Sequence, residues 1–303
     1  MRIATPGVGT YIRASKVPCS AEQQQNPGKD WRVKILLTND DGGDSPLFLF
    51  AIRVLRPMGD LKVVVPASEQ SWTGKSMTRL GRLDLTETSH DGVTVNHLSG
   101  TPADCANFGV YHLFDGKPDL VVSGINAGSN IGVSFVFSSG TVGACLEANI
   151  AGVPGIAFSQ ILGPGVFTHW SAHRRFPDGE GERLEGQAQA VMSRVFDALL
   201  PSGAPPEEPV TWSANIPPEL AQDWSLVHTG LGHTFYQSCF KPKEGGYHHN
   251  IERPEIDARE ETDGQAVLAG NVSLTRLDIR GFGQLDEGLS RPSPSLDSGY
   301  RES

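Results

Sequence analysis

Short apolar runs alternate with amphipathic segments along most of the chain. The runs lie at residues 33–37, 61–65, 120–125 and 155–159. Between them, apolar residues recur at helical spacing in three segments, 46–55, 101–110 and 140–152. Runs of branched apolar residues of this length are typical of strands that are buried on both faces. The alternation therefore predicts βαβ units and a mainly parallel sheet flanked by helices.

The predicted helices carry local start and stop signals. Ser45-Pro46 and Thr101-Pro102 each place a capping residue before a proline at the first helical position. Gly152 ends the helix that begins near Ser139. A further amphipathic helix is predicted at residues 188–199, and Pro201 stops it.

The rest of the chain predicts strands, loops and one arm. Alternation around His90-Asp91-Gly92 predicts a hairpin over residues 82–98 that lies against the main sheet, and two more strands are expected at 210–216 and 267–277. A linker is expected at 201–209. Residues 163–184 indicate an irregular loop that carries His169, His173, Arg174 and Arg175; these side chains could contact a substrate, but a solvated loop is the favoured interpretation. The aromatic-rich stretch at about 228–262 indicates an arm that packs on another subunit, because aromatic residues are enriched in interface cores.

The first apolar run ends in two adjacent carboxylates and two glycines, Asp40-Asp41-Gly42-Gly43. Neighbouring strand residues point to opposite faces, so Asp40 and Asp41 can converge only where the strand has ended, and the glycines permit such a turn. Two carboxylates that meet require a shared proton or a cation. Oxygen ligands of this kind suit Mg²⁺ or Mn²⁺. For this stretch alone, an ordinary Asp-Gly turn is an equal alternative.

Polar side chains also follow the other predicted strands. Ser71 comes after the second strand, Asn126 ends the third, and Ser139-Gly140-Thr141 stands at a helix start. Hydroxyl groups and free N–H groups at a helix N-terminus favour an anion. Each feature alone is better explained by ordinary loop or capping chemistry. Together, at one edge of a parallel sheet, they favour a metal-assisted phosphate site.

Three other features do not indicate a site of their own. Gly74-Lys75-Ser76 lacks the first glycine of a Walker phosphate loop, because that position is Glu69. Cys105 has no visible activating partner and is expected in the core. The pair His248-His249 lacks a third ligand at helix or hairpin spacing, so a metal there is the less favoured interpretation.

Composition narrows the class of protein further. A chain of 303 residues with 38% hydrophobic content can bury one large core, and a formal net charge of −10 argues against binding of duplex nucleic acid. Four cysteines without a CxxC pair indicate a reducing, cytoplasmic location. No apolar run approaches the ~20 residues that span a bilayer, so no membrane partner is expected. We expect a flexible extension over residues 1–30, one domain over 31–282 and a disordered tail over 283–303.

Four blocks of the chain stand in an order that is typical of one family. They are LLTNDDG at residues 36–42, GTPADC at 100–105, VSGINAGSN at 122–130 and SGTVGA at 139–144. These blocks closely resemble the signatures of the SurE family of survival-protein nucleotidases, and the similarity covers about residues 32–280. The resemblance implies a Rossmann-like α/β core with a C-terminal β-hairpin arm exchanged between subunits of a homodimer or homotetramer. It also implies divalent-metal-dependent removal of phosphate from nucleoside 5′- or 3′-monophosphates.

The resemblance also assigns residues by position. The family's metal ligands fall on Asp40, Asp41, Ser71 and Asn126, with one Mg²⁺ or Mn²⁺ per subunit, and Asp40 and Asp41 are the catalytic candidates. The phosphate-binding candidates are Ser139, Gly140, Thr141, Asn130 and Gly128. Trp72, Ser138 and the pair Gly43-Asp44 depart from the usual family residues, and we expect them near the substrate rather than near the metal.

Two other functions remain compatible with these residues. A metal-dependent sugar-nucleotide transferase also places clustered carboxylates on a cation after such a strand, but it would not release free phosphate from a monophosphate. A non-catalytic nucleotide-binding protein on the same fold would bind its ligand without turnover. Phosphate release from a monophosphate therefore separates the three functions.

Overall fold

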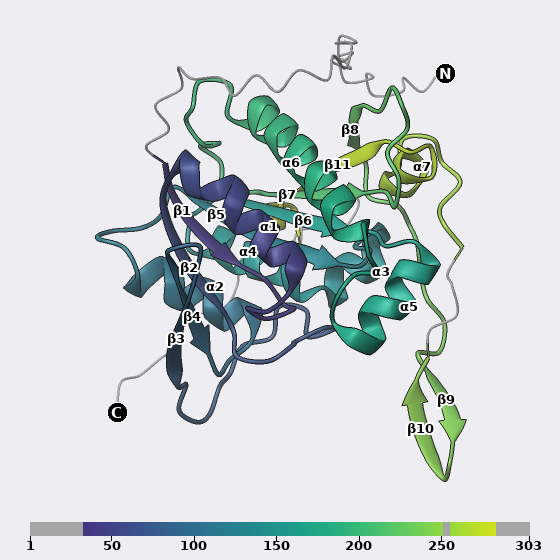
Figure 1. Cartoon of the computed structure of the whole chain (residues 1–303), viewed down its shortest axis with the longest axis horizontal. Coiled ribbons are helices and arrows are strands. Elements are labelled where there is room, and N and C mark those ends of the chain that lie inside the picture. Colours follow the sequence, from purple (N-terminus) through teal and green to yellow (C-terminus); the bar gives the residue numbers. More distant parts are fainter. Residues whose placement is uncertain (1–32, 251–254, 283–303) are drawn as a thin grey trace, which may run out of the picture.

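The computed structural model describes residues 33–250 and 255–282 of the chain (Figure 1). The extension expected at 1–30 and the tail expected at 283–303 lie outside these residues. The strands are β1 (Val33–Thr38), β2 (Gly59–Pro66), β3 (Leu85–His90), β4 (Val93–Leu98), β5 (Leu120–Ala127), β6 (Gly155–Gln160), β7 (Thr211–Ile216), β8 (Leu226–Thr229), β9 (Phe240–Lys243), β10 (Gly246–His249) and β11 (Val272–Leu277). The α-helices are α1 (Pro46–Leu55), α2 (Pro102–His112), α3 (Gly132–Ser138), α4 (Gly140–Ile150), α5 (Pro164–His173), α6 (Glu180–Leu199) and α7 (Asp263–Leu268), and short 3₁₀ turns lie at Arg56–Met58 and Ile279–Gly281.

Nine strands form one sheet in the order β3-β4-β2-β1-β5-β6-β7-β11-β8. The strands from β4 to β7 in this order are parallel to one another, while β3 pairs antiparallel with β4 and β11 pairs antiparallel with β7. The predicted mainly parallel sheet is confirmed. The chain passes from β1 to β2 on one side and later returns to β5 on the other side of β1. The carboxyl ends of β1 and β5 thus meet at a topological switch point, where ligands bind in open α/β sheets.

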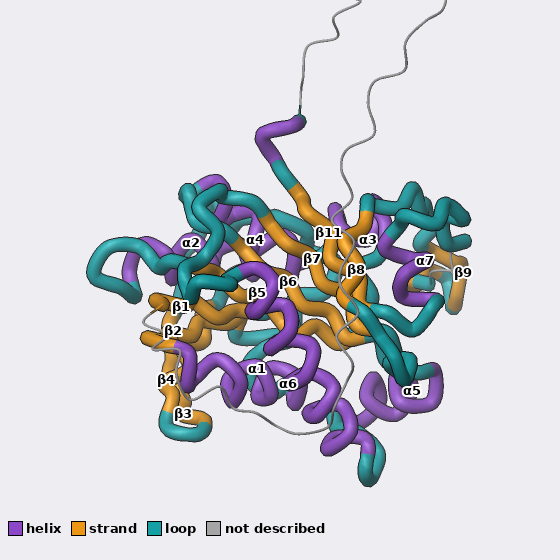
Figure 2. The backbone as a smooth tube through the Cα atoms, turned by 90° about the horizontal axis from the view of Figure 1, so that it is seen from above, coloured by secondary structure: helices purple, strands orange, loops and turns teal. Residues whose placement is uncertain are grey.

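Helices cover both faces of the sheet (Figure 2). Helices α1 and α6 lie on one face, and α2 and α4 lie on the other. The buried strand β1 serves both layers, because Ile35 and Leu37 join the cluster under α1 and α6 while Leu36 packs with Cys105 of α2. Cys105 is fully buried in this second layer, as expected for a core residue, and burial raises the pKa of its thiol.

Two expectations about secondary structure, for residues 163–184 and 267–277, are wrong. Residues 163–184 are not an irregular loop, because α5 occupies Pro164–His173 and α6 begins at Glu180. Helix α5 buries one large side chain, Trp170, so its sequence carries no apolar stripe that predicts a helix. Residues 267–277 are not one strand, since α7 extends to Leu268 and β11 begins only at Val272, after a turn at Gly270 with φ +76°.

Two hairpins complete the fold. The predicted hairpin of β3 and β4 does not lie against the sheet but extends it, because β4 pairs in parallel with β2. The β9–β10 hairpin lies at residues 240–249, and Figure 1 shows it projecting from the body of the molecule. All eight of its strand residues are exposed.

No single helix among the described residues is long and apolar enough to cross a bilayer. Among these residues, only α3 and α4 taken together, which meet at a bend of 72°, have the length and composition of a bent span.

Candidate active site

A cavity of about 410 Å³ lies where the carboxyl ends of β1, β2 and β5 meet. We call it the carboxyl-edge cavity. Six residues predicted for the site line its wall: Asp40, Ser71, Asn126, Gly128, Asn130 and Ser139. The other three predicted residues, Asp41, Gly140 and Thr141, do not line the cavity, but each lies within two residues of one that does. The structure therefore brings segments from four separate parts of the chain to one place.

A tight turn presents the two carboxylates at the end of β1. Gly42 adopts φ +85°, a conformation that favours glycine, and directly follows Asp41. Asn39 is fully buried and fixes the turn from inside, because its Nδ2 donates to the Gly42 carbonyl at 2.7 Å and its Oδ1 accepts from the Gly42 N–H at 3.1 Å. The direction of Asp40 and Asp41 is thus set by the backbone.

Asp40 is bound by the start of α4. Thr141 donates its hydroxyl to Asp40 Oδ1 at 2.7 Å and its N–H to Asp40 Oδ2 at 3.2 Å. Gly140 leaves room for this contact, since a Cβ atom there would lie 2.9 Å from the Cβ of Asp40. Thr141 is fully buried, so in this structure it holds Asp40 rather than facing the cavity.

Asp41 is bound by a different segment, the end of β5. Its Oδ2 accepts from the Ala127 N–H at 3.0 Å. Desolvation raises the pKa of Asp40, and desolvation together with the charge of Asp40 raises the pKa of Asp41. Two acidic groups, the buried Asp40 and the half-buried Asp41, are thus adjacent and are held by contacts that favour their charged forms. Such an arrangement is costly unless a cation or a proton balances it.

Three contacts fix the loop after β2, and this loop places Ser71 at the cavity. Lys75 pairs with the nearly buried Glu147 of α4, with 2.5 Å between Nζ and Oε2. Gly74 lies so close to α4 that a Cβ atom at Gly143 would stand 2.4 Å from its carbonyl oxygen. Thr78 donates its hydroxyl to Asp104 Oδ2 at 2.6 Å. Lys75 is therefore a structural anchor of the loop, and it does not line the cavity.

Other predicted residues already have protein partners. Ser139 caps α4, because its Oγ accepts from the Val142 N–H at 3.1 Å. Asn130 donates from Nδ2 to Ser159 Oγ at 2.7 Å, and the Gly128 N–H donates to the Gln160 carbonyl at 3.0 Å. These bonds fix the rim of the carboxyl-edge cavity around Asn126.

Four aromatic side chains line the cavity: Trp72, Phe135, Phe167 and Trp170. Trp72 has a φ of +66° and is 41% exposed, and its ring centroid lies 5.7 Å from that of Phe135. Trp72 and Ser138, two of the departures from the family pattern, both line the cavity. Gly43 instead faces His97, whose Cε1 would stand 2.4 Å from a Cβ at Gly43, and the pair Gly43-Asp44 does not line the cavity.

Sequence reasoning missed two charged residues that line this cavity, Glu69 and Arg174. Glu69 lies two residues before Ser71, and Arg174 is the C-terminal cap of α5 in a left-handed conformation, φ +53°. Arg174 was expected in a solvated loop. Its position depends on the packing of α5 through Trp170, for which the sequence offered no signal.

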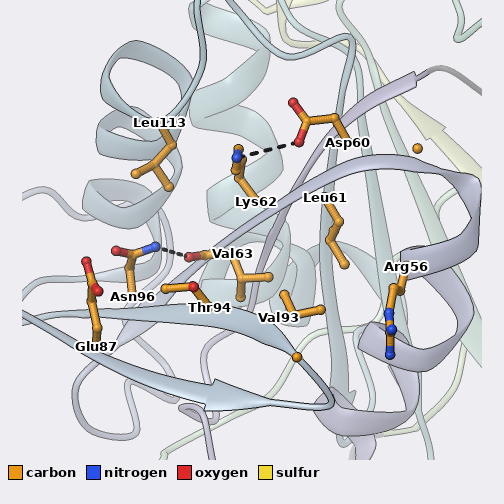
Figure 3. A pocket seen from close by; sticks show the side chains of 12 residues that line it. Arg56, Asp60, Leu61, Lys62, Val63, Glu87, Val93, Thr94, Asn96 and Leu113 are labelled. Atoms are coloured by element: carbon orange, nitrogen blue, oxygen red, sulfur yellow. Dashed lines mark hydrogen bonds and ion pairs between the residues drawn. The ribbon is translucent and has the colours of Figure 1, made fainter.

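A second and larger cavity, of about 610 Å³, lies at the other end of β2 (Figure 3). We call it the amino-edge cavity. Lys62 pairs there with Asp60 at 3.6 Å, and Asn96 donates to the Val63 carbonyl at 2.8 Å. Both members of the ion pair are about half exposed. None of the residues predicted for the site lies in this cavity.

The carboxyl-edge cavity fits a divalent cation with oxygen ligands. Among residues 33–250 and 255–282, no group of three or more His, Cys, Asp or Glu side chains is placed to hold a metal ion, and this includes His248 and His249. A cation at Asp40 and Asp41 would therefore need neutral oxygen donors as well. Ser71 and Asn126 offer a hydroxyl and an amide oxygen in the same cavity, a donor set that suits Mg²⁺ or Mn²⁺.

Fold and site together define an α/β protein with a polar ligand cavity at the switch point of a parallel sheet. Comparison with known proteins then identifies the family. The family model described as survival protein SurE matches residues 35–238, and the chain belongs to this family.

Individual relatives cover most of the chain. A protein named 5′-nucleotidase SurE from Methanopyrus kandleri is 47% identical over 258 residues, which span 84% of this chain and 94% of that protein. One with the same name from Thermofilum pendens is 33% identical over 253 residues, 82% of this chain and 92% of that protein. The crystal structure of the SurE protein from Aquifex aeolicus matches with a TM-score of 0.57 at 29% identity, over 80% of this chain and 92% of that one.

Proposed function

We propose that this chain is a metal-dependent phosphomonoesterase that removes phosphate from nucleoside 5′-monophosphates. Nucleoside 3′-monophosphates are a second substrate class within this proposal. The observation that carries it is the meeting of Asp40, Ser71, Asn126 and the start of α4 in one cavity, with the carboxylate of Asp41 next to Asp40 in the chain. The names of the relatives, which match over more than nine tenths of their own length, support the same activity.

One Mg²⁺ or Mn²⁺ per subunit would be held by Asp40, Asp41, Ser71 and Asn126. When bound, such an ion supplies Lewis-acid stabilisation of a phosphate oxygen and lowers the pKa of water. Asp40 and Asp41 are the proposed catalytic residues. Both would be ionised as ligands of the cation, and either carboxylate could act as base or nucleophile.

The phosphate group would bind beside the start of α4. Ser139, Gly140 and Thr141 lie at the positive end of the helix dipole, and Asn130 and Gly128 line the same cavity as Ser139. Thr141 contributes mainly through Asp40, to which it donates two hydrogen bonds. Donors that are fixed before the substrate arrives stabilise charge that develops in phosphoryl transfer.

The aromatic residues that line the cavity would bind the base of the nucleoside. Trp72 and Phe167 are both more than two fifths exposed and line the cavity that Asp40 and Ser71 also line. A flat base stacks on such rings by about 1–3 kcal/mol. These two rings support a nucleotide rather than a simple phosphate ester as the substrate.

The proposal also includes a homo-oligomer in the cytoplasm. The β9–β10 hairpin exposes Phe240 by 58% and Tyr247 by 75%, which supports a contact between two copies of the chain. Light scattering of the chain and of Tyr247→Ser tests it, and a wild-type monomer at micromolar concentration would contradict it.

Phosphate release from a panel of nucleoside monophosphates tests the activity. The protein is stripped with EDTA, and Mg²⁺ or Mn²⁺ is added back, with Asp40→Asn measured beside it. We expect hydrolysis that returns with the metal and is lost in the variant. A folded protein that releases no phosphate from any substrate with either metal would contradict the proposal.

A further inference from the structure

The hydroxyl of Ser71 is oriented by a neighbouring carboxylate. Ser71 donates from Oγ to Glu69 Oε1 at 2.8 Å. A serine hydroxyl has one hydrogen and two acceptor lone pairs. Because the hydrogen is committed to Glu69, Ser71 can offer only lone pairs to other groups in the cavity, as a cation ligand must. Without this bond, the hydroxyl could rotate and donate to a carboxylate.

Glu69 is itself held by Arg174. Its second oxygen, Oε2, forms an ion pair with Nη2 of Arg174. The guanidinium carbon lies 4.6 Å from the ring centroid of Trp170, which is only 5% exposed. Both oxygens of Glu69 are thus engaged, one by Ser71 and one by Arg174. Glu69 is therefore held in place by Arg174 while it orients the hydroxyl of Ser71.

We infer that Glu69 and Arg174 are positioning residues that preset Ser71 Oγ to accept a divalent cation. The line of contacts runs from the buried Trp170 through Arg174 and Glu69 to Ser71, and so links α5 to the loop after β2. This inference rests on the proposed function, because it assumes a cation at Asp40 and Asp41. It adds a role for two residues that lie outside the proposed ligand set.

Calorimetric binding of Mn²⁺ to the EDTA-stripped full chain tests the inference. Four proteins are compared: wild type, Glu69→Ala, Ser71→Ala and the double variant. Each single change is expected to weaken Mn²⁺ binding about tenfold, the lower end of the usual effect of groups that support metal ligands. The double variant is expected to bind no more weakly than Ser71→Ala, since Glu69 acts only through Ser71.

Matched controls separate orientation from general charge. Glu69→Gln keeps an acceptor for the Ser71 hydroxyl and should recover most of the affinity that Glu69→Ala loses. Arg174→Met should weaken binding, because it frees Glu69 to move. Glu185→Ala removes the partner of Arg53 on the α1–α6 side and should leave Mn²⁺ binding unchanged.

The outcomes distinguish this inference from the proposed function. Wild-type affinity in Glu69→Ala would overturn the inference alone. A further loss in the double variant beyond Ser71→Ala would also overturn it, because Glu69 would then act on the cation through its own charge or by direct contact rather than through Ser71. A wild-type chain that binds no Mn²⁺ would overturn the proposed metal dependence, and the inference with it.

Discussion

The two cavities at opposite ends of β2 differ in how far their charged groups are buried, and the larger cavity is the one whose charges are exposed. The amino-edge cavity is the larger, yet its ion pair of Lys62 and Asp60 is about half exposed, so water already solvates both groups. The carboxyl-edge cavity is smaller, and Asp40 beside it is 4% exposed. A cation interacts more strongly with buried carboxylates than with carboxylates that water already solvates, because the surrounding dielectric constant is lower. Burial of like charges is therefore the better sign of a site than volume.

The largest expected contrast comes from removing one carboxylate at each cavity. Asp40→Asn deletes an anionic ligand and should lower kcat by about 10²–10⁴-fold, or about 3–5 kcal/mol of barrier. Asp60→Asn removes a solvated group and should change kcat less than about twofold. Steady-state phosphate release at saturating Mn²⁺ measures both, and circular dichroism checks the fold. Equal activities in the two variants would remove the distinction between the cavities.

The next contrast concerns stability. Lys75→Met leaves Glu147, whose side chain is 6% exposed, without its cation, and should lower the free energy of unfolding by about 2 kcal/mol. Because Lys75 is itself 32% exposed, this is less than the full cost of breaking a buried pair. Lys62→Met should change stability by less than about 0.5 kcal/mol. Urea unfolding of both variants checks the difference, and a similar loss in both would show that the loop is not anchored by Lys75.

A smaller effect is expected on the substrate side of the carboxyl-edge cavity. Trp72→Ala removes an exposed ring that can stack on a base, and should lower kcat/KM for nucleoside monophosphates about tenfold, which corresponds to about 1.4 kcal/mol. For ribose 5-phosphate, which has no base, the change should stay within about twofold. An equal loss of kcat/KM for both substrates would mean that Trp72 maintains the shape of the site and does not stack on the base. Leu61→Ala, in the amino-edge cavity, is the matched control.

The smallest effect is on pH dependence. Burial raises the pKa of Asp40 to about 6, and burial with the charge of Asp40 raises that of Asp41 to about 7, from an ordinary 3.8. Protons therefore occupy the metal-free site as the pH falls below about 7, and Mn²⁺ must displace them. Apparent Mn²⁺ affinity should be steady at higher pH and fall severalfold between pH 7 and 6. Asp41→Asn should flatten this slope, while Ser71→Ala should lower the affinity but keep the slope.

The sequence predicted the parts of the fold and site that are local. The strand β1 and its turn follow from an apolar run that ends in Asp-Asp-Gly, and the cap of α4 follows from Ser139. The meeting of these segments follows from parallel topology, which the alternation of strands and helices predicted. Residues whose role depends on packing between distant elements could not be found in this way.

The position of Arg174 could not be predicted from the sequence. Helix α5 has a single buried anchor, so no periodic pattern marks it, and a left-handed cap at its end directs Arg174 to Glu69. Glu69 lies in an ordinary polar loop, and a carboxylate two residues before a serine is too common to signal support for a ligand. Strand β11 was placed too early for a similar reason, because the apolar residues of α7 continue the pattern of the strand.

The position of a bound cation tests the proposed metal site most directly. Crystals of the full chain grown with Mn²⁺ would be measured near the manganese absorption edge. We expect one anomalous peak within about 2.6 Å of oxygen atoms from Asp40, Asp41, Ser71 and Asn126. A peak in the amino-edge cavity beside Asp60 and Glu87, with none at Asp40 and Asp41, would contradict it.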